Sequence, residues 1–455
     1  MKNHTILGIL TFLLSSPLGI TAADHNTVHL KGQLIDMGSN HVEMTYDGAA
    51  SLVGDSRTIM LHTDKAGNFD TTFVLKAPAF YRISRNTLYL SPGDDMTVHI
   101  TTNNKEASFT GKGAIANVYM KHRLFPKGGS YLEGGSNLRA DFPKTKALVD
   151  SLAAVRRQQL NNLKGVSEEF KELENARITA DVLNSYICYG SYSRMLAGVK
   201  SEDEMKQKLN GFYQTLTAEA KPIYRELAKD ELMDVAVVRD VMSYIVAPDM
   251  DACKAWAEGI TLSPRIKEMY EAANKVRILR EKVDPATLDS IVAFIKNLNN
   301  KDFADELQGK IQQARKLMKG SPAIDITFTD VEGNTHHLSD FKGKAIYLDF
   351  WATWCGPCIH ESPYFEALSK EYAGKNIVFI PISTDTAHKA WLSFLKAHKK
   401  ELKQYNCVDD KLRSEWAIFY IPRFVLIDKD FNIVDAYAPR PSEDAAKTLI
   451  NTLLK

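Results

Sequence analysis

The 455-residue chain is predicted to be a multidomain α+β and α/β protein, with an N-terminal antiparallel β domain, a central helical region and a C-terminal α/β domain. Three observations predict this order. Short β-rich runs alternate with turns over residues 24–113, and apolar residues recur three and four apart over residues 114–320. Strand and helix patterns then alternate over residues 321–455.

Residues 1–23 have the pattern of a secretory signal peptide. Lys2 supplies the positive charge, Ile6 to Leu14 the apolar core, and Thr21-Ala22-Ala23 the small-residue cleavage site. The apolar run is too short for a membrane helix, which needs about 18 to 20 residues. We therefore expect a soluble protein exported to the periplasm or cell envelope. An uncleaved membrane anchor is the alternative, and a lipoprotein is not expected because no cysteine lies near the cleavage site.

Composition excludes two classes of protein. The 57 Lys and Arg residues nearly balance the 56 Asp and Glu residues, so no bulk positive field would attract nucleic acid. Five cysteines in a chain of this length are too few and too unevenly spaced for a disulfide framework. Two of them, Cys355 and Cys358, form a Cys-x-x-Cys pair that needs its own explanation.

The N-terminal part is predicted to be β-sandwich-like. Its strand patterns end in turn sequences at residues 64–67 and 91–94, where glycine and proline allow backbone angles that other residues resist. The expected strands are VHLKGQLI, HVEMTYDG, RTIMLHT, FDTTFVL, FYRISR and TLYLSPGDDMTVHI.

The central part is predicted to be helical, interrupted by a Gly-rich loop over residues 126–137. Ser201 with Glu204 forms a potential capping box, while Ser263-Pro264 and Asp284-Pro285 combine an N-cap with proline in the first turn. We interpret this region as a scaffold or spacer. Docking of a partner or substrate is the alternative.

The last helix of this region is expected to end at Gly320, followed by Pro322. The run AIYLDFW beyond it is apolar apart from Asp349, which is typical of a central strand covered on both faces. A helix is then expected from the cysteines, and another over residues 387–399. The runs NIVFIPI, RFVLID and NIVDAY are further strands, the last two forming a closing hairpin, and Ser442 is expected to cap a final helix.

The position of the cysteine pair predicts redox chemistry. Cys355 at the start of a helix lies where free backbone N–H groups and the helix dipole stabilise a thiolate, so we expect it to be the nucleophile. Cys358 lies one turn later, close enough to form a disulfide with Cys355, and is expected to be the resolving thiol. Asp349 and Glu361 are the candidate bases for Cys358. The alternatives are that Asp349 is a satisfied buried polar group and that Glu361 is a solvated charge.

The sequences DFWATWCGPC and WCGPCIHESP resemble the thioredoxin superfamily and its exported TlpA/ResA-like branch, with the pattern Trp-Cys-x-x-Cys-x-x-Glu-x-Pro. The resemblance covers about residues 321–455 and implies a thioredoxin-like fold. It also implies that Asp349 is the buried aspartate of thioredoxins and that Glu361 is the active-site glutamate of this branch. Pro363 matches a helix-kinking proline, and Ile421-Pro422 matches a cis-proline segment whose backbone contacts an extended substrate.

Trp354 is interpreted as a rim residue beside the cysteines, which makes Trp354, Ile421 and Pro422 the expected substrate-binding residues. One departure is Phe431, where relatives usually have glycine. The regions ahead of the redox domain resemble, more diffusely, those of long exported members from Bacteroidetes-type bacteria.

The resemblance implies an exported thiol:disulfide oxidoreductase that reduces disulfide-containing protein substrates through a mixed disulfide. Its expected electron donor is a membrane-bound thiol reductase, and no cofactor is expected. A peroxiredoxin-like peroxidase is an alternative, although the Pro-x-x-x-Thr-x-x-Cys loop is missing. A noncatalytic binding protein with a relic redox domain is another. A metal site is not expected, since Cys188, Cys253 and Cys407 are isolated in sequence.

Overall fold

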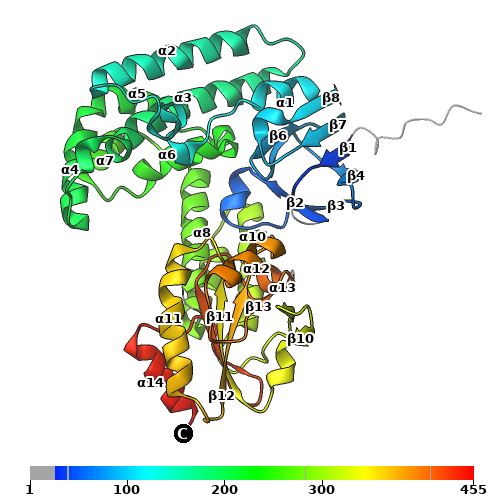
Figure 1. Ribbon diagram of the computed structural model, residues 1–455. Helices are drawn as coiled ribbons and strands as arrows, with labels where there is room; N and C mark the ends of the chain where they lie inside the picture. Colours follow the sequence, from blue (N-terminus) through cyan, green and yellow to red (C-terminus); the bar gives the residue numbers. More distant parts are fainter. Residues whose placement is uncertain (1–25, 38–39, 282, 410) are drawn as a thin grey trace, which may run out of the picture.

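The computed structural model describes residues 26–37, 40–281, 283–409 and 411–455. The signal peptide predicted at residues 1–23 lies outside this part. Figure 1 shows two bodies. We call residues 26–316 the N-terminal body and residues 317–455 the C-terminal body. Helices α8 and α10 extend from the first body to the second.

The N-terminal body starts with two four-stranded sheets in the described part of the chain, ordered β4-β1-β7-β8 and β3-β2-β5-β6. Neighbouring strands pair antiparallel except β1 and β7, which are parallel. The antiparallel β domain expected from sequence therefore contains one parallel pair. The strands are β1 Thr27–Leu34, β2 His41–Tyr46, β3 Ile59–His62, β4 Asn68–Val74, β5 Ala79–Ile83, β6 Asn86–Leu90, β7 Asp95–Ile100 and β8 Ser108–Lys112.

Helices make up the rest of this body. They are α1 Ala114–Met120, α2 Phe142–Asn161, α3 Glu168–Tyr192, α4 Glu202–Thr215, α5 Thr217–Leu227, α6 Ala236–Val246, α7 Asp251–Ala257, α8 Pro264–Glu281, α9 Pro285–Ile295 and α10 Lys301–Lys316. Asp284 caps α9 as expected, accepting the N–H of Thr287 at 3.0 Å. Ser201 accepts the N–H of Glu204, but the Glu204 carboxylate accepts from Lys200 instead of Ser201. Only half of the predicted capping box forms.

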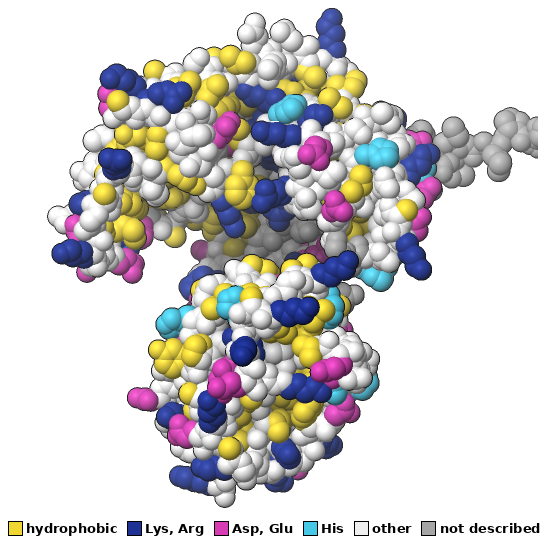
Figure 2. All heavy atoms as spheres, viewed as in Figure 1, with side chains coloured by type: hydrophobic (Ala, Val, Ile, Leu, Met, Phe, Trp, Pro, Cys, Tyr) yellow, Lys and Arg dark blue, Asp and Glu magenta, His cyan; other side chains and the backbone are white. Residues whose placement is uncertain are grey.

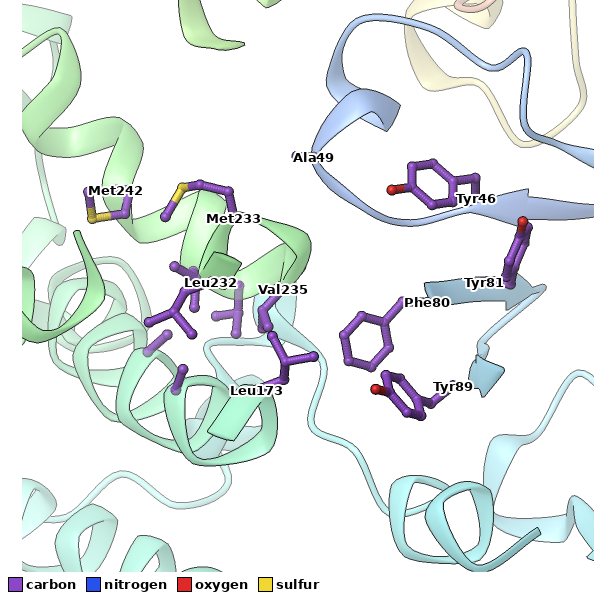
Figure 3. Packing of buried hydrophobic residues seen from close by; sticks show 14 of the residues in the cluster. Tyr46, Ala49, Phe80, Tyr81, Tyr89, Leu173, Leu232, Met233, Val235 and Met242 are labelled. Carbon is purple, nitrogen blue, oxygen red and sulfur yellow. The ribbon is translucent and has the colours of Figure 1, made fainter. Parts of the chain in front are cut away.

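The sheets and the helices of the N-terminal body share one core. A single cluster of buried apolar residues runs from Val28 to Ala314. Figure 3 shows the junction, where aromatic side chains of the sheet, among them Phe80 and Tyr89, lie beside aliphatic side chains of the helices. The Tyr89 ring packs on Phe170 of α3 with 5.0 Å between ring centroids, an arrangement that contributes about 0.5–1.5 kcal/mol beyond area burial. The sheets and helices are therefore packed as one body.

The domain boundaries at residues 113 and 320 stay predictions. The packing of buried side chains around residue 113 differs from that around residue 320. Buried side chains continue across residue 113 without interruption. Near residue 320, in contrast, a separate buried cluster starts at Leu317.

The C-terminal body is built on a seven-stranded sheet of order β10-β9-β13-β12-β11-β14-β15 in the described residues. Every residue of β11 is buried, as expected for a central strand, and β11 pairs parallel with β12 and antiparallel with β14. The elements are β9 Thr327–Asp330, β10 Thr335–His337, β11 Ala345–Trp351, α11 Gly356–Glu371, β12 Ile377–Ser383, α12 His388–Ala397, β13 Tyr405–Asn406, α13 Lys411–Ser414, β14 Arg423–Ile427, β15 Ile433–Asp435 and α14 Asp444–Leu453.

Helices cover both faces of this sheet, as the order of elements predicted. Phe365 of α11 and Ile450 of α14 pack on one face together with Tyr347. Leu412 of α13 and the following Trp416 pack on the other face with Leu348. Because alternate residues of a strand point to opposite faces, β11 contributes side chains to both layers.

Two details of the C-terminal body differ from or qualify the expectations. Ser442 does not cap α14, whose N-cap is Glu443; it is bonded to Glu361 instead. The prediction for Ser442 was wrong because a serine before a helix can donate to a distant carboxylate that local sequence does not reveal. Phe431 adopts φ +69°, the left-handed conformation that favours glycine. The turn at Asp428 therefore keeps a backbone shape suited to glycine although the residue is phenylalanine.

Candidate active site

The two cysteines lie at the start of α11 and are joined by a disulfide with 5.3 Å between their Cα atoms. Cys355 is the N-cap residue, and its Sγ accepts the backbone N–H of Cys358 at 3.2 Å. Pro357 occupies the first turn, where no N–H donor is needed. Cys355 is 5% exposed and Cys358 1% exposed. Both residues are therefore buried, Cys355 slightly less so than Cys358.

Apolar side chains surround the disulfide. Both cysteines pack in one cluster with Trp351 at the end of β11 and Trp391 of α12, and Ile421 lies partly buried against it. Trp354, in contrast, is 73% exposed. Trp351 is therefore a core residue, whereas the exposure of Trp354 is consistent with its interpretation as a rim residue.

The loop that carries the expected cis-proline directly precedes β14. The Ile421–Pro422 peptide bond is cis. Arg423, the next residue, pairs with Phe350 of β11, so the segment lies at the cysteine end of the central strands. The structure therefore places Ile421 and Pro422 beside the cysteines, and Ile421 contacts the disulfide cluster.

A buried aspartate that sequence reasoning missed holds the turn before Cys355. Asp385 follows β12 and accepts the backbone N–H and the hydroxyl of Thr353, both at 2.9 Å, while Ser383 donates to it at 2.7 Å. The order of strands could have predicted this contact. Strands β11 and β12 are parallel, so the residues that follow their carboxyl ends meet at one edge of the sheet.

Glu361 is buried, with 2% of its surface exposed, and is held by several groups. Its carboxylate accepts the Ser442 N–H at 3.2 Å and the Ser442 hydroxyl at 3.0 Å. His360 and Arg440 approach its Oε1 to 3.7 and 4.0 Å. Glu361 is therefore not the freely solvated first-turn charge that was considered as an alternative.

Asp349 lies in β11 between Tyr347 and Trp351 and is 3% exposed. It lines a small cavity under α11 together with Phe365 and Glu366. Its Oδ1 has no hydrogen-bond partner among the described residues, which excludes the reading of Asp349 as a fully satisfied polar group. Burial raises the pKa of this carboxyl to about 8, with Glu361 adding to the rise and Lys400 opposing it.

We expect Asp349→Asn to stabilise the oxidised protein at alkaline pH. An aspartate whose folded pKa is raised from 3.8 to about 8 binds its proton more tightly in the folded state, so wild-type stability falls as pH rises through this interval. Asparagine is neutral throughout, and the variant should gain several kcal/mol by about pH 9, since each pKa unit corresponds to about 1.4 kcal/mol. Urea unfolding between pH 4 and 9 measures the difference.

The matched control for this prediction is Asp430→Asn, whose carboxylate is 66% exposed in the same body. A stability difference between wild type and Asp349→Asn that stays constant from pH 4 to 9 would contradict the raised pKa.

The remaining cysteines do not join the site. Cys253 and Cys407 are buried, and the Cys407 thiol donates to the Thr327 carbonyl at 3.2 Å. Burial raises the pKa of Cys188 and Cys253 to about 11 and that of Cys407 to about 12. Thiols with such pKa values carry almost no thiolate near neutral pH and are poor nucleophiles.

Comparisons with known proteins find relatives of the C-terminal part of the chain. The Redoxin family model matches residues 318–451. Thiol-disulfide oxidoreductase ResA from Bacillus cereus (strain ATCC 10987) is 33% identical over 129 residues, which cover 28% of this chain and 73% of that protein. ResA from Geobacillus kaustophilus is 30% identical over 111 residues, covering 24% and 64%. A crystal structure of a putative thiol-disulfide oxidoreductase from Bacteroides vulgatus is 65% identical, covers 30% of this chain and 99% of that one, and has a TM-score of 0.30.

A seven-stranded sheet with a Cys-x-x-Cys disulfide at the start of a helix defines the class: this is a thiol:disulfide oxidoreductase with a thioredoxin-like domain. More particularly, the chain belongs to the TlpA/ResA-like thiol:disulfide oxidoreductases, on the strength of its identity to ResA across most of that protein's length.

Proposed function

We propose that the protein reduces disulfides of exported proteins through the Cys355–Cys358 pair. The observation that carries the proposal is the placement of these cysteines: Cys355 is the N-cap residue of α11, and Cys358 is more deeply buried one turn further in. A nucleophile at a helix start beside a buried resolving thiol suits two-step exchange.

The proposed reaction starts from the reduced dithiol. The Cys355 thiolate attacks one sulfur of a substrate disulfide; that S–S bond breaks, a mixed disulfide forms, and the second substrate sulfur leaves as a thiolate that takes up a proton. Cys358 then loses its proton and attacks the Cys355 sulfur. This closes the enzyme disulfide and releases the first substrate sulfur. Two electrons pass from the enzyme dithiol to the substrate.

Asp349 and Glu361 are proposed to assist Cys358, with different tasks. A carboxyl whose pKa is about 8 can accept and return a proton near neutral pH, which suits Asp349 as the base. Glu361 is held by Ser442 and lies near Arg440 and His360, and its carboxyl group is proposed to shape the electrostatic field around the cysteines. Trp354, Ile421 and Pro422 are proposed to contact the substrate.

The setting of the reaction follows from the predicted leader at residues 1–23. We propose export to the periplasm or cell envelope, where a reductase needs an external supply of electrons. No helix in the described residues is long and apolar enough to cross a membrane. The proposed electron donor is a separate membrane-bound thiol reductase that reduces the Cys355–Cys358 disulfide.

The reduction potential of the Cys355–Cys358 couple tests the proposed direction. Titration of the full chain against a dithiol buffer is expected to give about −250 mV or lower, as for thioredoxin-type reductants. The reduced protein should also reduce insulin disulfides, and Cys355→Ser should not. A potential near about −120 mV, the range of strong oxidants, would reverse the assigned direction.

A further inference from the structure

Residues 411–420 of the C-terminal body, which we call the docking segment, contact the N-terminal body. Gln313 of α10 donates from Nε2 to the carbonyls of Arg413 and Ser414, at 2.9 and 2.7 Å. The Tyr420 hydroxyl donates to the Arg280 carbonyl near the end of α8. Backbone carbonyls take part on both sides of the contact, so these bonds hold the backbone of the segment and not only its side chains.

Phe419 is the centre of this contact. Its ring lies close to three cations: Arg280 and Lys310 of the N-terminal body, at 5.2 and 4.9 Å from the ring centroid, and Arg413 at 5.6 Å. Carboxylates of the N-terminal body pair with Lys310 and Arg413. The apolar side of the contact is lined by Val276, Leu279, Ala314, Leu317 and Ala417.

Arg413 extends the contact to the β-rich part of the N-terminal body. It pairs with Glu43 of β2 at 2.9 Å and lies 3.9 Å from Asp55, in the loop before β3, which also pairs with Lys310 at 2.8 Å. The Lys310 and Arg413 charges help to lower the pKa of Asp55, against the effect of its own burial. The docking segment is thus held by sheets and helices together.

The docking segment directly precedes Ile421 and Pro422, the proposed substrate-binding residues. Ile421 follows Tyr420 and packs against two clusters, one that contains Trp416 and Ala417 and one that contains the disulfide. Beyond Pro422, Arg423 donates from Nε to the Ala436 carbonyl and stacks on Tyr437, whose hydroxyl donates to the Leu279 carbonyl at 2.8 Å. Helix α8 is therefore linked to the substrate-binding loop from both sides of Ile421 and Pro422.

Backbone strain in the docking segment indicates that packing holds it in place. Ala417 is buried and adopts φ +53°, in the left-handed region. This conformation is unfavourable for a residue with a Cβ and persists only where surrounding contacts impose it. The neighbours that line this position include Ala314 of α10 and Leu317, which directly follows α10.

The cysteine end of the C-terminal body is turned toward the N-terminal body. Helix α12, whose Trp391 packs on the disulfide, lies on the side that faces the upper body in Figure 1. Figure 2 shows a furrow between the two bodies, with Lys and Arg side chains on its upper side. A substrate segment that reaches Cys355 from this side passes beside the N-terminal body.

We propose that the N-terminal body is part of the substrate site: through α8, α10 and the docking segment it positions Ile421 and forms one side of the groove that holds an extended, disulfide-bearing polypeptide next to Cys355. The inference rests on the proposed reductase function and assigns a task to the region that sequence analysis interpreted as a scaffold. Arg280, Lys310 and Phe419 are positioning residues, and the reacting sulfur atoms remain those of the two cysteines.

The test compares a protein disulfide with a small one in the full chain. Arg280→Glu combined with Lys310→Glu places carboxylates around the Phe419 ring and next to Asp55, and Phe419→Ala removes the ring from the other side. For insulin, KM is expected to rise about three- to tenfold in both variants with kcat little changed, because binding is lost and not chemistry. For 5,5′-dithiobis(2-nitrobenzoate), which needs no groove, rates should change by less than about twofold.

Lys267→Glu, which reverses an exposed charge on α8, is the matched control. It should change neither the KM for insulin nor the rate with 5,5′-dithiobis(2-nitrobenzoate). Unchanged KM for insulin in both docking variants would overturn the inference and leave the N-terminal body a spacer. An equal loss with both substrates, or a shifted reduction potential, would overturn it too, because the redox centre itself would be damaged. A wild-type protein that reduces neither substrate would refute the proposed function, which is a different result.

Discussion

Replacing Cys358 with serine is expected to arrest the protein at the mixed disulfide. Cys355 keeps its place at the start of α11 and still attacks a substrate, but no second thiol lies one turn away to release it. Multiple turnover should fall to background, while covalent complexes with substrate proteins accumulate. Non-reducing electrophoresis of the affinity-purified variant from cells measures the complexes, and a reducing agent should dissolve them.

Two controls make the Cys358→Ser result specific. The double variant with Cys355→Ser should trap nothing, because the attacking sulfur is gone. Cys407→Ser should resemble wild type, because the Cys407 thiol is buried and bonded to the Thr327 carbonyl. If Cys358→Ser forms no covalent complexes in cells in which the wild type is active, the roles of the two cysteines have been assigned wrongly.

Arg177→Met is expected to cause the largest loss of stability in the N-terminal body. Arg177 lies in α3, is 1% exposed, and donates to Glu174 at 2.8 Å and to Asp181 at 2.6 Å. Removing it leaves two buried carboxylates without their cation, which typically costs about 3–5 kcal/mol. Asp181 also accepts from Ser130, so the Gly-rich loop should loosen with α3. Urea unfolding together with hydrogen exchange of the α3 amides measures both effects.

Arg277→Met is the matched control for Arg177→Met. Arg277 makes the same (i, i+4) pair with Glu281 on α8, but the two side chains are 62% and 60% exposed. Such exposed pairs contribute about 0.3–0.5 kcal/mol. Similar small losses in both variants would mean that the buried cluster contributes little to the stability of the body.

Much of the fold could be predicted because local patterns decide it. The run Ala345 to Trp351 is apolar at every position except Asp349 and became a fully buried central strand. Asp284 and Pro285 start a helix because one caps it and the other suits its first turn. The half-formed capping box at Ser201 shows the limit, since a carboxylate can bond to a neighbouring N–H instead of the expected one.

The candidate site likewise has features that local sequence predicts and features that depend on contacts between distant residues. Cys355 and Cys358 are close because the first turn of α11 brings them together, and spacing alone predicts this. The burial of Asp349 and its raised pKa depend on α11 lying over β11, and the Ser442 bond to Glu361 joins residues 81 positions apart. Asp385 and Lys400 were missed because their roles arise from neighbours that are distant in the chain.

By itself, the sequence determined the helix and strand periods, the redox pair at a helix start and the likeness to the TlpA/ResA-like branch. These are properties of residues a few positions apart, whose effects on backbone geometry act locally. Only the tertiary structure decided that the sheets and helices of the N-terminal body share a core, and that Phe419 joins that body to the loop carrying Pro422. Such contacts depend on which distant segments pack together, and short-range periodicity and capping carry no information about that.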